Sequence, residues 1–373
     1  MRIMITGGGT GGHISPALAI IEELRRRDPQ LLLQWVGCKD KLEEKVCARN
    51  GIPFRSLPVS GWPRSQSIRR LWVGIKLLYS FLRASLYLRA FQPQLVVGVG
   101  GYVSLPLMWT AQRMGIPTVL HEQNKTLGMA NRMVAPRARR IFLSYADTAG
   151  NPPEAASRVV GNPVRAGFVH PPEQQAAREG LGLDPDLPTL LVSGGSQGAH
   201  AINLAVADAL QGLSASRLQV IWMTGKEDLD MARNTAETLD VPVLPFAYID
   251  DMPQAFAAAD IIISRAGASS TAEIAAMGKP SILIPYPYAT DNHQEQNARA
   301  FETAGAAHCL LESEMSATVL RERILELIDN PERRDAMGSA ARDLANPLAA
   351  EAIVEELMLL VFNTDAHSVD GAD

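Results

Sequence analysis

One long stretch of the sequence lacks acidic side chains: no aspartate or glutamate occurs between Lys45 and His121. Residues 1–160 carry 22 lysines and arginines against 9 acidic residues, whereas the rest of the chain carries 13 against 31. The net charge of −5 therefore conceals a basic first half and an acidic second half. A field of one sign indicates that the first half meets an anionic partner, and a membrane surface, a lipid phosphate and a nucleic acid all fit this description.

Cysteine is scarce as well. Cys38, Cys47 and Cys309 are too few and too scattered for a disulfide framework, and they lack the C-x-x-C spacing of a zinc site. We interpret them as buried thiols in a reducing compartment. No apolar run at the N-terminus is long enough for a secretory signal, because Met1–Thr6 leads directly into glycines. We therefore expect the protein to remain in the cytoplasm.

What is present is typical of a globular protein, with 47% hydrophobic and 20% charged residues. The length of 373 residues favours two domains. Short apolar runs alternate with helical patterns, which predicts parallel α/β sheets in two Rossmann-like domains. The expected strands are Arg2–Thr6, Leu32–Val36, Leu95–Val99, Thr118–His121, Arg140–Leu143, Thr189–Ser193, Gln219–Thr224, Asp260–Ser264 and Ser281–Pro285.

Three glycine-rich segments follow expected strands, at 7–12, 100–101 and 194–198. Such loops let a backbone approach a phosphate, and a following helix offers free N–H groups. A site for NAD would need an acidic residue at the end of the second strand, where the sequence has Trp35-Val36-Gly37. None of the loops ends in the Gly-Lys-Ser/Thr of a nucleotide triphosphatase, so hydrolysis of a triphosphate is disfavoured.

The segment Ser264–Glu273 is the most informative in the chain. Serine and threonine side chains lie where a helix is expected to begin after a strand and a glycine, which suits a diphosphate. Glu273 lies one turn further on, where its carboxylate can accept hydrogen bonds from both hydroxyls of a ribose. The alternative interpretation of Glu273 is a capping-box glutamate. The polar cluster 291–298 suits the hydroxyls of a sugar.

The motifs also occur in a recognisable order. Gly-Gly-Gly-Thr-Gly-Gly-His at 7–13, Gly-Val-Gly-Gly-Tyr at 98–102, His-Glu-Gln-Asn at 121–124, Gly-Asn-Pro-Val-Arg at 161–165 and Gly-Gly-Ser-Gln-Gly-Ala at 194–199 are followed by the segments 265–273 and 291–298. Together they closely resemble the MurG family of bacterial peptidoglycan glycosyltransferases, which belongs to glycosyltransferase family 28. The resemblance covers residues 1–360.

The resemblance implies a GT-B fold of the α/β class, with two Rossmann-like domains whose parallel sheets face a deep cleft. It implies a hexosyltransferase that moves GlcNAc from UDP-GlcNAc to the 4-hydroxyl of MurNAc in undecaprenyl-diphospho-MurNAc-pentapeptide (lipid I), giving lipid II. It also implies a peripheral protein on the cytoplasmic face of the plasma membrane. The expected partners are UDP-GlcNAc, lipid I, an anionic membrane surface and other cell-wall synthesis or division proteins, with no cofactor and no nucleic acid.

We expect the boundary between the two domains near Gly161–Arg165, where proline and polar residues are frequent. Residues 1–162 form an acceptor- and membrane-binding domain, and residues 163–343 form a UDP-GlcNAc-binding domain. Residues 344–362 form a helix that packs back on the first domain, and residues 363–373 form a disordered tail.

The family pattern assigns candidate site residues. Those expected to contact UDP-GlcNAc are Thr10, Gly11, Gly12, Asn124, Arg165, Ser196, Ile249 (through its backbone), Arg265, Ala268, Ser269, Ser270, Thr271, Ala272, Glu273 and Gln294. Weaker candidates for acceptor contacts are Gly100, Gly101, Tyr102, His121 and Glu122.

Inverting transfer needs a base for the attacking hydroxyl and positive potential for the departing UDP. Enzymes of the GT-B fold generally supply the latter from a helix N-terminus, and the sequence has no metal-ligand cluster that indicates otherwise. His13 is the candidate base, since an imidazole suits proton transfer near neutral pH. The alternative is that His13 orients the loop or binds the acceptor phosphate.

Residues 61–91 combine apolar and basic side chains at helical spacing. A transmembrane helix is disfavoured, because Lys76 and Arg83 near its centre would each cost about 2.5–3.5 kcal/mol on insertion. A core helix remains an alternative. We favour a basic amphipathic surface that lies on anionic lipid. The residues expected on this membrane face are Trp72, Ile75, Tyr79, Phe81, Leu82 and Arg83.

Three other functions compete with this one. The first is another enzyme of the same fold, such as a UDP-GlcNAc epimerase or a transferase with a soluble acceptor, although the 61–91 stretch disfavours a soluble acceptor. The second is a non-catalytic membrane scaffold, which the presence of His13, Glu273 and Gln294 disfavours. The third is a nucleic-acid binder, but no recognised DNA- or RNA-binding module is present and the acidic half would repel phosphate.

Overall fold

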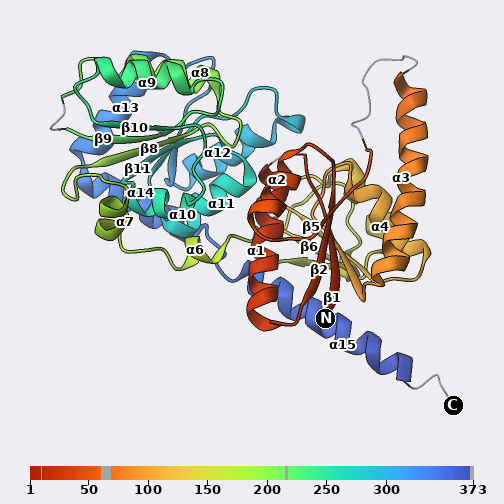
Figure 1. The fold of residues 1–373 in the computed structure, drawn as a ribbon. Helices are drawn as coiled ribbons and strands as arrows, with labels where there is room; N and C mark the ends of the chain where they lie inside the picture. Colours follow the sequence, from red (N-terminus) through yellow and green to blue (C-terminus); the bar gives the residue numbers. More distant parts are fainter. Residues whose placement is uncertain (10, 60–68, 215–216, 370–373) are drawn as a thin grey trace. The chain divides into compact units, whose positions relative to one another are not determined.

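The computed structural model describes residues 1–9, 11–59, 69–214 and 217–369. The chain divides into two compact units (Figure 1). Unit 1 comprises Met1–Arg165 together with Leu348–Asp373, and unit 2 comprises Ala166–Pro347. Each unit has a parallel sheet covered by helices, as the sequence predicts.

Unit 1 is built on a parallel sheet whose described strands follow the order β3-β2-β1-β4-β5-β6-β7. The chain moves outward from β1 to β3, returns to the other side of β1, and moves outward again. This reversal makes the sheet doubly wound. The strands are β1 (Arg2–Thr6), β2 (Leu32–Gly37), β3 (Phe54–Ser56), β4 (Leu95–Gly98), β5 (Thr118–Glu122), β6 (Arg140–Leu143) and β7 (Ser157–Val159).

Helices cover both faces of this sheet (Figure 1). Ile3 and Ile5 belong to a buried cluster with α1 and α15, whereas Met4 between them packs with α3 and α4 on the other face. Side chains alternate across a strand, so a strand buried on both faces must be continuously apolar. The helices of unit 1 are α1 (Gly11–Arg27), α2 (Leu42–Arg49), α3 (Arg69–Phe91), α4 (Ser104–Arg113), α5 (Met129–Val134) and α15 (Ala349–Val369).

Unit 2 repeats the design with the strand order β10-β9-β8-β11-β12-β13 and a core of its own. Its strands are β8 (Thr189–Ser193), β9 (Gln219–Met223), β10 (Val243–Phe246), β11 (Ile261–Ser264), β12 (Ser281–Leu283) and β13 (Ala307–Cys309). Its helices are α6 (Ala166–Val169), α7 (Gln174–Gly180), α8 (His200–Leu210), α9 (Leu229–Thr238), α10 (Met252–Ala258), α11 (Ala268–Met277), α12 (His293–Thr303), α13 (Ala317–Asp329) and α14 (Pro331–Asp343).

The nine strands expected from the sequence are all present, with ends that differ by two residues at most. The pattern missed β3, β7, β10 and β13, which have only three or four residues each and lie at or next to a sheet edge. These strands are largely half-buried or exposed, so they lack the continuous apolar runs of the strands that are buried on both faces.

The C-terminal segment forms α15, which is described as far as Val369. The disordered tail expected at residues 363–373 stays a prediction. No proline or glycine occurs between Phe362 and Gly371, so nothing in the backbone interrupts the helical hydrogen bonds. The helix packs on α1 and buries Ile353, Val354, Leu357 and Val361 in the core of unit 1.

Within the part of the chain that the structure describes, we find no helix whose length and apolar character would let it cross a bilayer.

Candidate active site

In unit 1, β1 and β4 are neighbours at the point where the strand order reverses. Doubly wound sheets bind ligands at the carboxyl ends of strands at such a point. β1 leads into Gly7–Gly9, and β4 leads into Gly100 and Gly101, so both glycine segments lie where a ligand is expected.

The two segments pack against each other so closely that side chains are excluded. A β-carbon on Gly7 would lie 2.2 Å from Val99 Cγ2, and one on Gly101 would lie 2.4 Å from the carbonyl oxygen of Gly8. Gly100 has a φ of +97°, and a β-carbon there would lie 2.7 Å from Cδ2 of His13. The candidate base His13, in the first turn of α1, therefore has its ring against the backbone of the second glycine segment.

His121 and Glu122 lie at the end of β5 and are fully buried, so neither side chain is presented to an acceptor. Burial, with a smaller contribution from the positive potential of His13, lowers the pKa of His121 to about 4, although the hydrogen bond with Gly161 opposes the shift. Nε2 of His121 lies 3.3 Å from the carbonyl oxygen of Gly161, and Nδ1 has no hydrogen-bond partner. Both side chains therefore lie beneath the surface in this structure, and their expected contact with the acceptor stays a prediction.

Glu122 organises the loop between β5 and α5. Its carboxylate accepts hydrogen bonds from the backbone N–H of Asn124 at 3.1 Å and of Gly128 at 2.9 Å. It also accepts from the side-chain amides of Asn124 at 3.1 Å and Asn131 at 2.9 Å. Burial nevertheless raises the pKa of Glu122. The amide of Asn124, which the sequence analysis assigned to the donor, is thus directed at Glu122.

Tyr102 follows Gly100 and Gly101 and is 53% exposed, unlike the buried acceptor candidates His121 and Glu122. Met129 and Met133 on α5 are 67% and 59% exposed. The carboxylate of Glu122 holds the residue before α5, so this apolar surface is positioned by the same network.

In unit 2, the reversal lies between β8 and β11. β8 leads into the glycine loop 194–199, and β11 leads into the segment 265–267 and then α11. The two segments that the sequence analysis assigned to the donor therefore flank one switch point, which is where the rule for doubly wound sheets places a ligand.

The loop 194–199 is tightly packed on the turn after β9. Gly198 has a φ of +81°, and a β-carbon on it would lie 2.0 Å from the carbonyl oxygen of Thr224. A β-carbon on Gly225 would lie 2.3 Å from the carbonyl oxygen of Gln197. Gly195, with φ of +90°, has no atom within 4 Å of its β-position, so the tip of the loop is open on that side. Ser196 lies at this tip and is partly exposed.

Helix α11 begins at Ala268 and contains the rest of the expected donor segment through Glu273. Its N-cap is Gly267, which has no side chain of its own to cap the helix. Asn297 on α12 is 3% exposed and donates a hydrogen bond of 3.0 Å to the carbonyl oxygen of Ala266, which fixes the approach to the helix. Ser269 and Thr271 are buried, whereas Ser270 and Glu273 are partly exposed.

Arg265 is engaged within the protein. Its guanidinium forms a 2.6 Å ion pair with Glu312 and donates hydrogen bonds to the carbonyl oxygens of Ile284 at 3.3 Å and Pro285 at 3.2 Å. It also lies over the ring of Tyr286, 5.4 Å from the centroid. The side chain is only 12% exposed, so the contacts place Arg265 as a support for the loop after β12.

Two further donor candidates have hydrogen-bond partners in unit 2. Oε1 of Gln294 accepts a 3.0 Å hydrogen bond from the backbone N–H of Tyr286, which orients this amide at the start of α12. The backbone N–H of Ile249 lies 3.4 Å from Sδ of Met223. Ile249 itself is buried, which agrees with a role through its backbone rather than its side chain.

Sequence reasoning missed a network beside the loop 194–199. Asn203 on α8 donates to the carbonyl oxygen of Thr224 at 2.8 Å and to Asp228 at 2.7 Å, and it accepts from Nε1 of Trp222 at 3.0 Å. Nδ1 of His200 lies 2.8 Å from the other oxygen of Asp228. No local sequence pattern connects His200 with Asp228.

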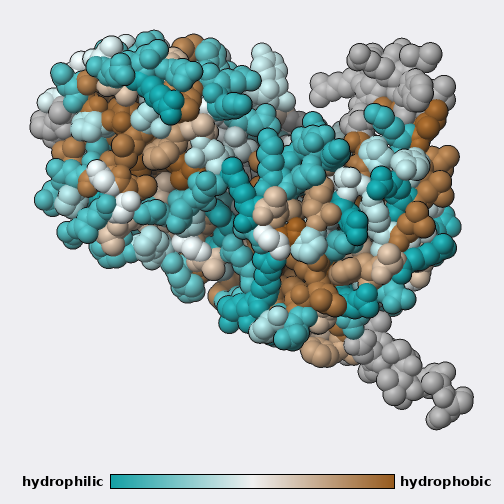
Figure 2. Space-filling model, in the orientation of Figure 1, coloured by the Kyte–Doolittle hydropathy of each residue, from teal (hydrophilic) through white to brown (hydrophobic). Residues whose placement is uncertain are grey.

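The residues expected on the membrane face lie on more than one face of α3. Ile75, Tyr79 and Leu82 are 51%, 52% and 61% exposed, and Leu78 and Leu86 extend the same stripe. Phe81 lies on another face, because its ring packs edge-on against Trp109 of α4 at 5.0 Å. Figure 2 shows hydrophobic surface along α3.

The remaining candidates are placed as follows. Arg83 contacts the hydroxyl of Tyr87 and lies over the ring of Tyr79 at 5.9 Å. Gly11 and Gly12 open α1, and Arg165 ends the first segment of unit 1. Thr10 and the side chain of Trp72 lie outside the described residues.

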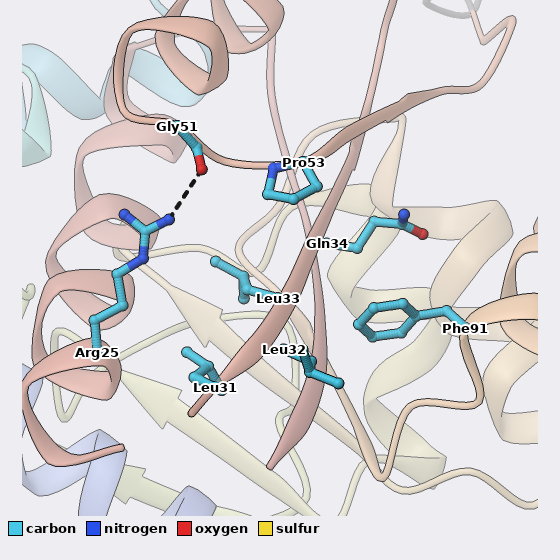
Figure 3. A pocket seen from close by; sticks show the side chains of 8 residues that line it. All are labelled: Arg25, Leu31, Leu32, Leu33, Gln34, Gly51, Pro53 and Phe91. Carbon is cyan, nitrogen blue, oxygen red and sulfur yellow. Dashed lines mark hydrogen bonds between the residues drawn. The ribbon is translucent and has the colours of Figure 1, made fainter. Parts of the chain in front are cut away.

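A separate hollow of about 340 Å³ lies at the start of β2, at the opposite end of the strands from the glycine loops (Figure 3). Its lining is mainly apolar, and Arg25 at its side donates a hydrogen bond to the carbonyl oxygen of Gly51. None of the candidate site residues lines it.

Comparison with known families decides the identity of the fold. The model of the glycosyltransferase family 28 N-terminal domain matches residues 3–143, and that of the glycosyltransferase family 28 C-terminal domain matches residues 189–353. The chain belongs to glycosyltransferase family 28.

Relatives within family 28 match almost the whole chain. A UDP-N-acetylglucosamine--N-acetylmuramyl-(pentapeptide) pyrophosphoryl-undecaprenol N-acetylglucosamine transferase from Exiguobacterium sp. is 42% identical, with 95% of this chain and 98% of the relative covered. A transferase of the same name from Geobacter sulfurreducens is 39% identical, with 96% and 98% covered.

Solved structures agree. The crystal structure of Acinetobacter baumannii MurG matches with a TM-score of 0.74 and 29% identity, covering 96% of this chain and 99% of that one. A UDP-GlcNAc 2-epimerase from Neisseria meningitidis has a TM-score of 0.65 and only 15% identity over 96% of this chain and 100% of that chain, which shows a shared fold alone. The match to MurG supports the GT-B fold that the sequence indicates.

Proposed function

We propose that this chain is an inverting glycosyltransferase that moves GlcNAc from UDP-GlcNAc to the 4-hydroxyl of MurNAc in lipid I, giving lipid II. Its near-full-length relatives carry the name of this activity. At the level of individual residues, the proposal is supported by the donor region of unit 2. There the loop 194–199 and the N-terminus of α11 flank the switch point between β8 and β11.

The donor's UDP is held by unit 2 in this proposal. Backbone N–H groups at Ser196 and at the start of α11 face the diphosphate, and the positive end of the helix dipole stabilises the charge that develops on UDP as it leaves. Glu273 accepts from the ribose hydroxyls, Ile249 reads the uracil through its backbone, and Gln294 binds the sugar. Arg265 holds the loop after β12, and Gln294 is hydrogen-bonded to that loop through Tyr286.

The acceptor is held by unit 1 in this proposal. His13 takes the proton from the attacking 4-hydroxyl of MurNAc while the bond between GlcNAc and UDP breaks. The pKa of His121 supports this choice between the two histidines, since a side chain with a pKa of about 4 and no exposure is a poor base for a bound sugar.

The deciding experiment incubates the purified chain with UDP-GlcNAc and a lipid I analogue with a short lipid. Formation of the disaccharide product with release of UDP is the expected result. Calorimetric titration with UDP-GlcNAc, UDP-GalNAc, UDP-glucose and NAD tests donor selectivity, and UDP-GlcNAc is expected to bind most tightly. Formation of an epimerised nucleotide sugar without acceptor, or tight binding of NAD, would overturn the proposal.

Replacing the base should affect the chemical step. We expect His13→Ala to lower kcat at least about 100-fold with little change in the KM for UDP-GlcNAc, because general-base catalysis typically contributes this much. His170→Ala is a matched control, since His170 is exposed in unit 2. A kcat within about tenfold of wild type together with a raised KM for lipid I would instead make His13 a binding residue.

We also propose that α3 lies on anionic lipid at the cytoplasmic face of the membrane. A continuous stripe of exposed apolar side chains supports this, because such a stripe is rare on a surface that meets only water. Lys76 is exposed on the same helix and adds positive charge.

Vesicle sedimentation tests the membrane proposal. The protein should bind vesicles that contain anionic phospholipid, and binding should weaken with salt. Leu82→Glu should weaken binding, whereas Leu204→Glu, which alters a 45% exposed leucine of α8 in unit 2, should not. Equal binding to neutral vesicles, or no binding to either kind, contradicts the proposal.

A further inference from the structure

A buried carboxylate lies directly beneath the first glycine loop. Glu43, in the first turn of α2, has no exposed surface. Its Oε2 accepts a 3.2 Å hydrogen bond from the backbone N–H of Gly9, and its Oε1 accepts a 3.0 Å hydrogen bond from the backbone N–H of Cys38. One side chain therefore ties the loop after β1 to the loop after β2.

Two glycines leave the space that this carboxylate fills. A β-carbon on Gly8 would lie 2.4 Å from Oε1 of Glu43, and all three atoms nearest to that position belong to Glu43. A β-carbon on Gly37 would lie 2.7 Å from Cγ of Glu43. Gly8 and Gly37 do not have positive φ angles, so the need for glycine comes from neighbouring side chains and not from the backbone. At Gly8 the neighbour is Glu43, and at Gly37 the neighbours are Glu43 and the ring of Phe54.

The carboxylate changes what the loop can bind. The N–H of Gly9 already donates to Glu43, so it is not directed at a phosphate. A negative charge under the loop also opposes a bound anion. The glycines at 7–9 therefore serve close packing rather than the cradling of a diphosphate that a G-x-G-x-x-G motif suggests.

The loop 7–9 also affects the position of the candidate base His13. The carbonyl oxygen of Gly8 contacts Gly101, and the neighbouring Gly100 lies against the ring of His13. A shift of Gly8 and Gly9 would thus reach both the second glycine segment and the start of α1. A displacement of about 1 Å at a reacting group can cost about 100-fold in rate.

We propose that Glu43 is a positioning residue for the sugar-transfer reaction: it holds the loop 7–9 in the form that places His13 and the acceptor-side glycines. This inference rests on the proposed function. Glu43 touches neither donor nor acceptor in it and acts through the loop.

The first test compares two neighbouring carboxylates. Glu43→Gln keeps the shape but only one acceptor oxygen, and Glu43→Ala keeps none, so kcat should fall in that order, by about 100-fold for the alanine variant. Glu44→Gln is the matched control, because Glu44 on the same helix accepts from the backbone N–H of Asp40 and does not contact the loop. The Kd for UDP alone should stay within about twofold in every variant, since the proposed function places UDP on unit 2.

The second test uses the contact between Gly8 and Glu43. Gly8→Ala alone should lower both kcat and the melting temperature, because its methyl group must displace the carboxylate. In a Glu43→Ala background the same change should cost little further stability, since the space is vacant. Such a double-mutant cycle isolates the coupling of the two positions.

The outcomes separate the two proposals. An inactive wild-type chain would defeat the proposed function. The double-mutant cycle measured by melting temperature would then still test the contact between Gly8 and Glu43. An active wild type with a Glu43→Gln variant that melts lower but keeps its kcat would make Glu43 merely structural. Equal costs of Gly8→Ala in both backgrounds would disprove the contact on which the inference depends.

Discussion

The conformation of the loops at this site depends more on buried polar residues than on exposed ones. Glu43, Glu122 and Asn131 hold the loops of unit 1 by accepting or donating several hydrogen bonds each. A buried polar group that loses its partner costs about 1–3 kcal/mol, so such networks fix a loop in one conformation. The motif His-Glu at 121–122 marks the architecture of the site and not its contact surface.

The burial of His121 predicts a pH dependence of stability. Its folded pKa of about 4 lies below its ordinary value of 6.5, so the unfolded chain binds the proton first as the pH falls. The free energy of unfolding should therefore fall between pH 6.5 and 4. From pH 7 to pH 5 the wild type should lose about 2 kcal/mol more than His121→Gln, measured by denaturant unfolding.

The control for this comparison is His170→Gln, which alters an exposed histidine. It should lose stability in parallel with the wild type. If His121→Gln followed the wild type as well, His121 would not be the group that titrates.

At the scale of elements, a helix N-terminus can bind a ligand well only when the segment that leads into the helix is held in one conformation. The residues before α11 are held by α12 through Asn297 and by Arg265, which is paired with Glu312. Asn297 lies outside the segment 265–273 and gives no signal of its own, since an asparagine in a polar cluster has many possible roles. The contact with Ala266 assigns it.

Removing this contact should weaken the donor site. We expect Asn297→Ala to raise the Kd for UDP-GlcNAc by about tenfold, the equivalent of one hydrogen bond of roughly 1.4 kcal/mol. Arg299→Ala, on the exposed face of the same helix and outside the polar cluster, should leave it unchanged. Calorimetric titration of both variants measures the difference, and equal affinities would show that the loop holds its form without Asn297.

At the scale of the whole molecule, unit 1 is discontinuous in sequence. Helix α15 follows unit 2 in the chain but packs on α1, and Glu356 pairs with Arg140 at 3.1 Å and Arg158 at 2.8 Å. The buried clusters of unit 1 and unit 2 share no residue. Damage to α15 should therefore act on unit 1.

A charge in the buried face of α15 tests this. Leu357→Asp should destabilise unit 1 by about 3–5 kcal/mol, because an unpaired carboxylate would enter its core. Leu359→Asp, on the exposed face of the same helix, should change stability by less than about 0.5 kcal/mol. Denaturant unfolding measures the loss, and the Kd for UDP-GlcNAc reports whether unit 2 stays folded. Equal stability of the two variants would show that α15 contributes little.

The sequence by itself determined the class of fold, nine of the described strands and the glycine loops that lie at both switch points. These features have local signals: apolar runs, glycine after a strand, and polar residues at a helix start. The family motifs also indicated which half binds the nucleotide sugar. The short edge strands and the end of α15 gave no such signal.

Only the tertiary structure decided which polar groups are partners. Gly9 and Glu43 are 34 residues apart, and Arg140 and Glu356 are 216 apart. No local pattern encodes such pairs, because the sheet order brings them together after the chain has reversed direction. The same reason explains why Arg265, His121 and Phe81 looked like contact residues in the sequence and face inward in the fold.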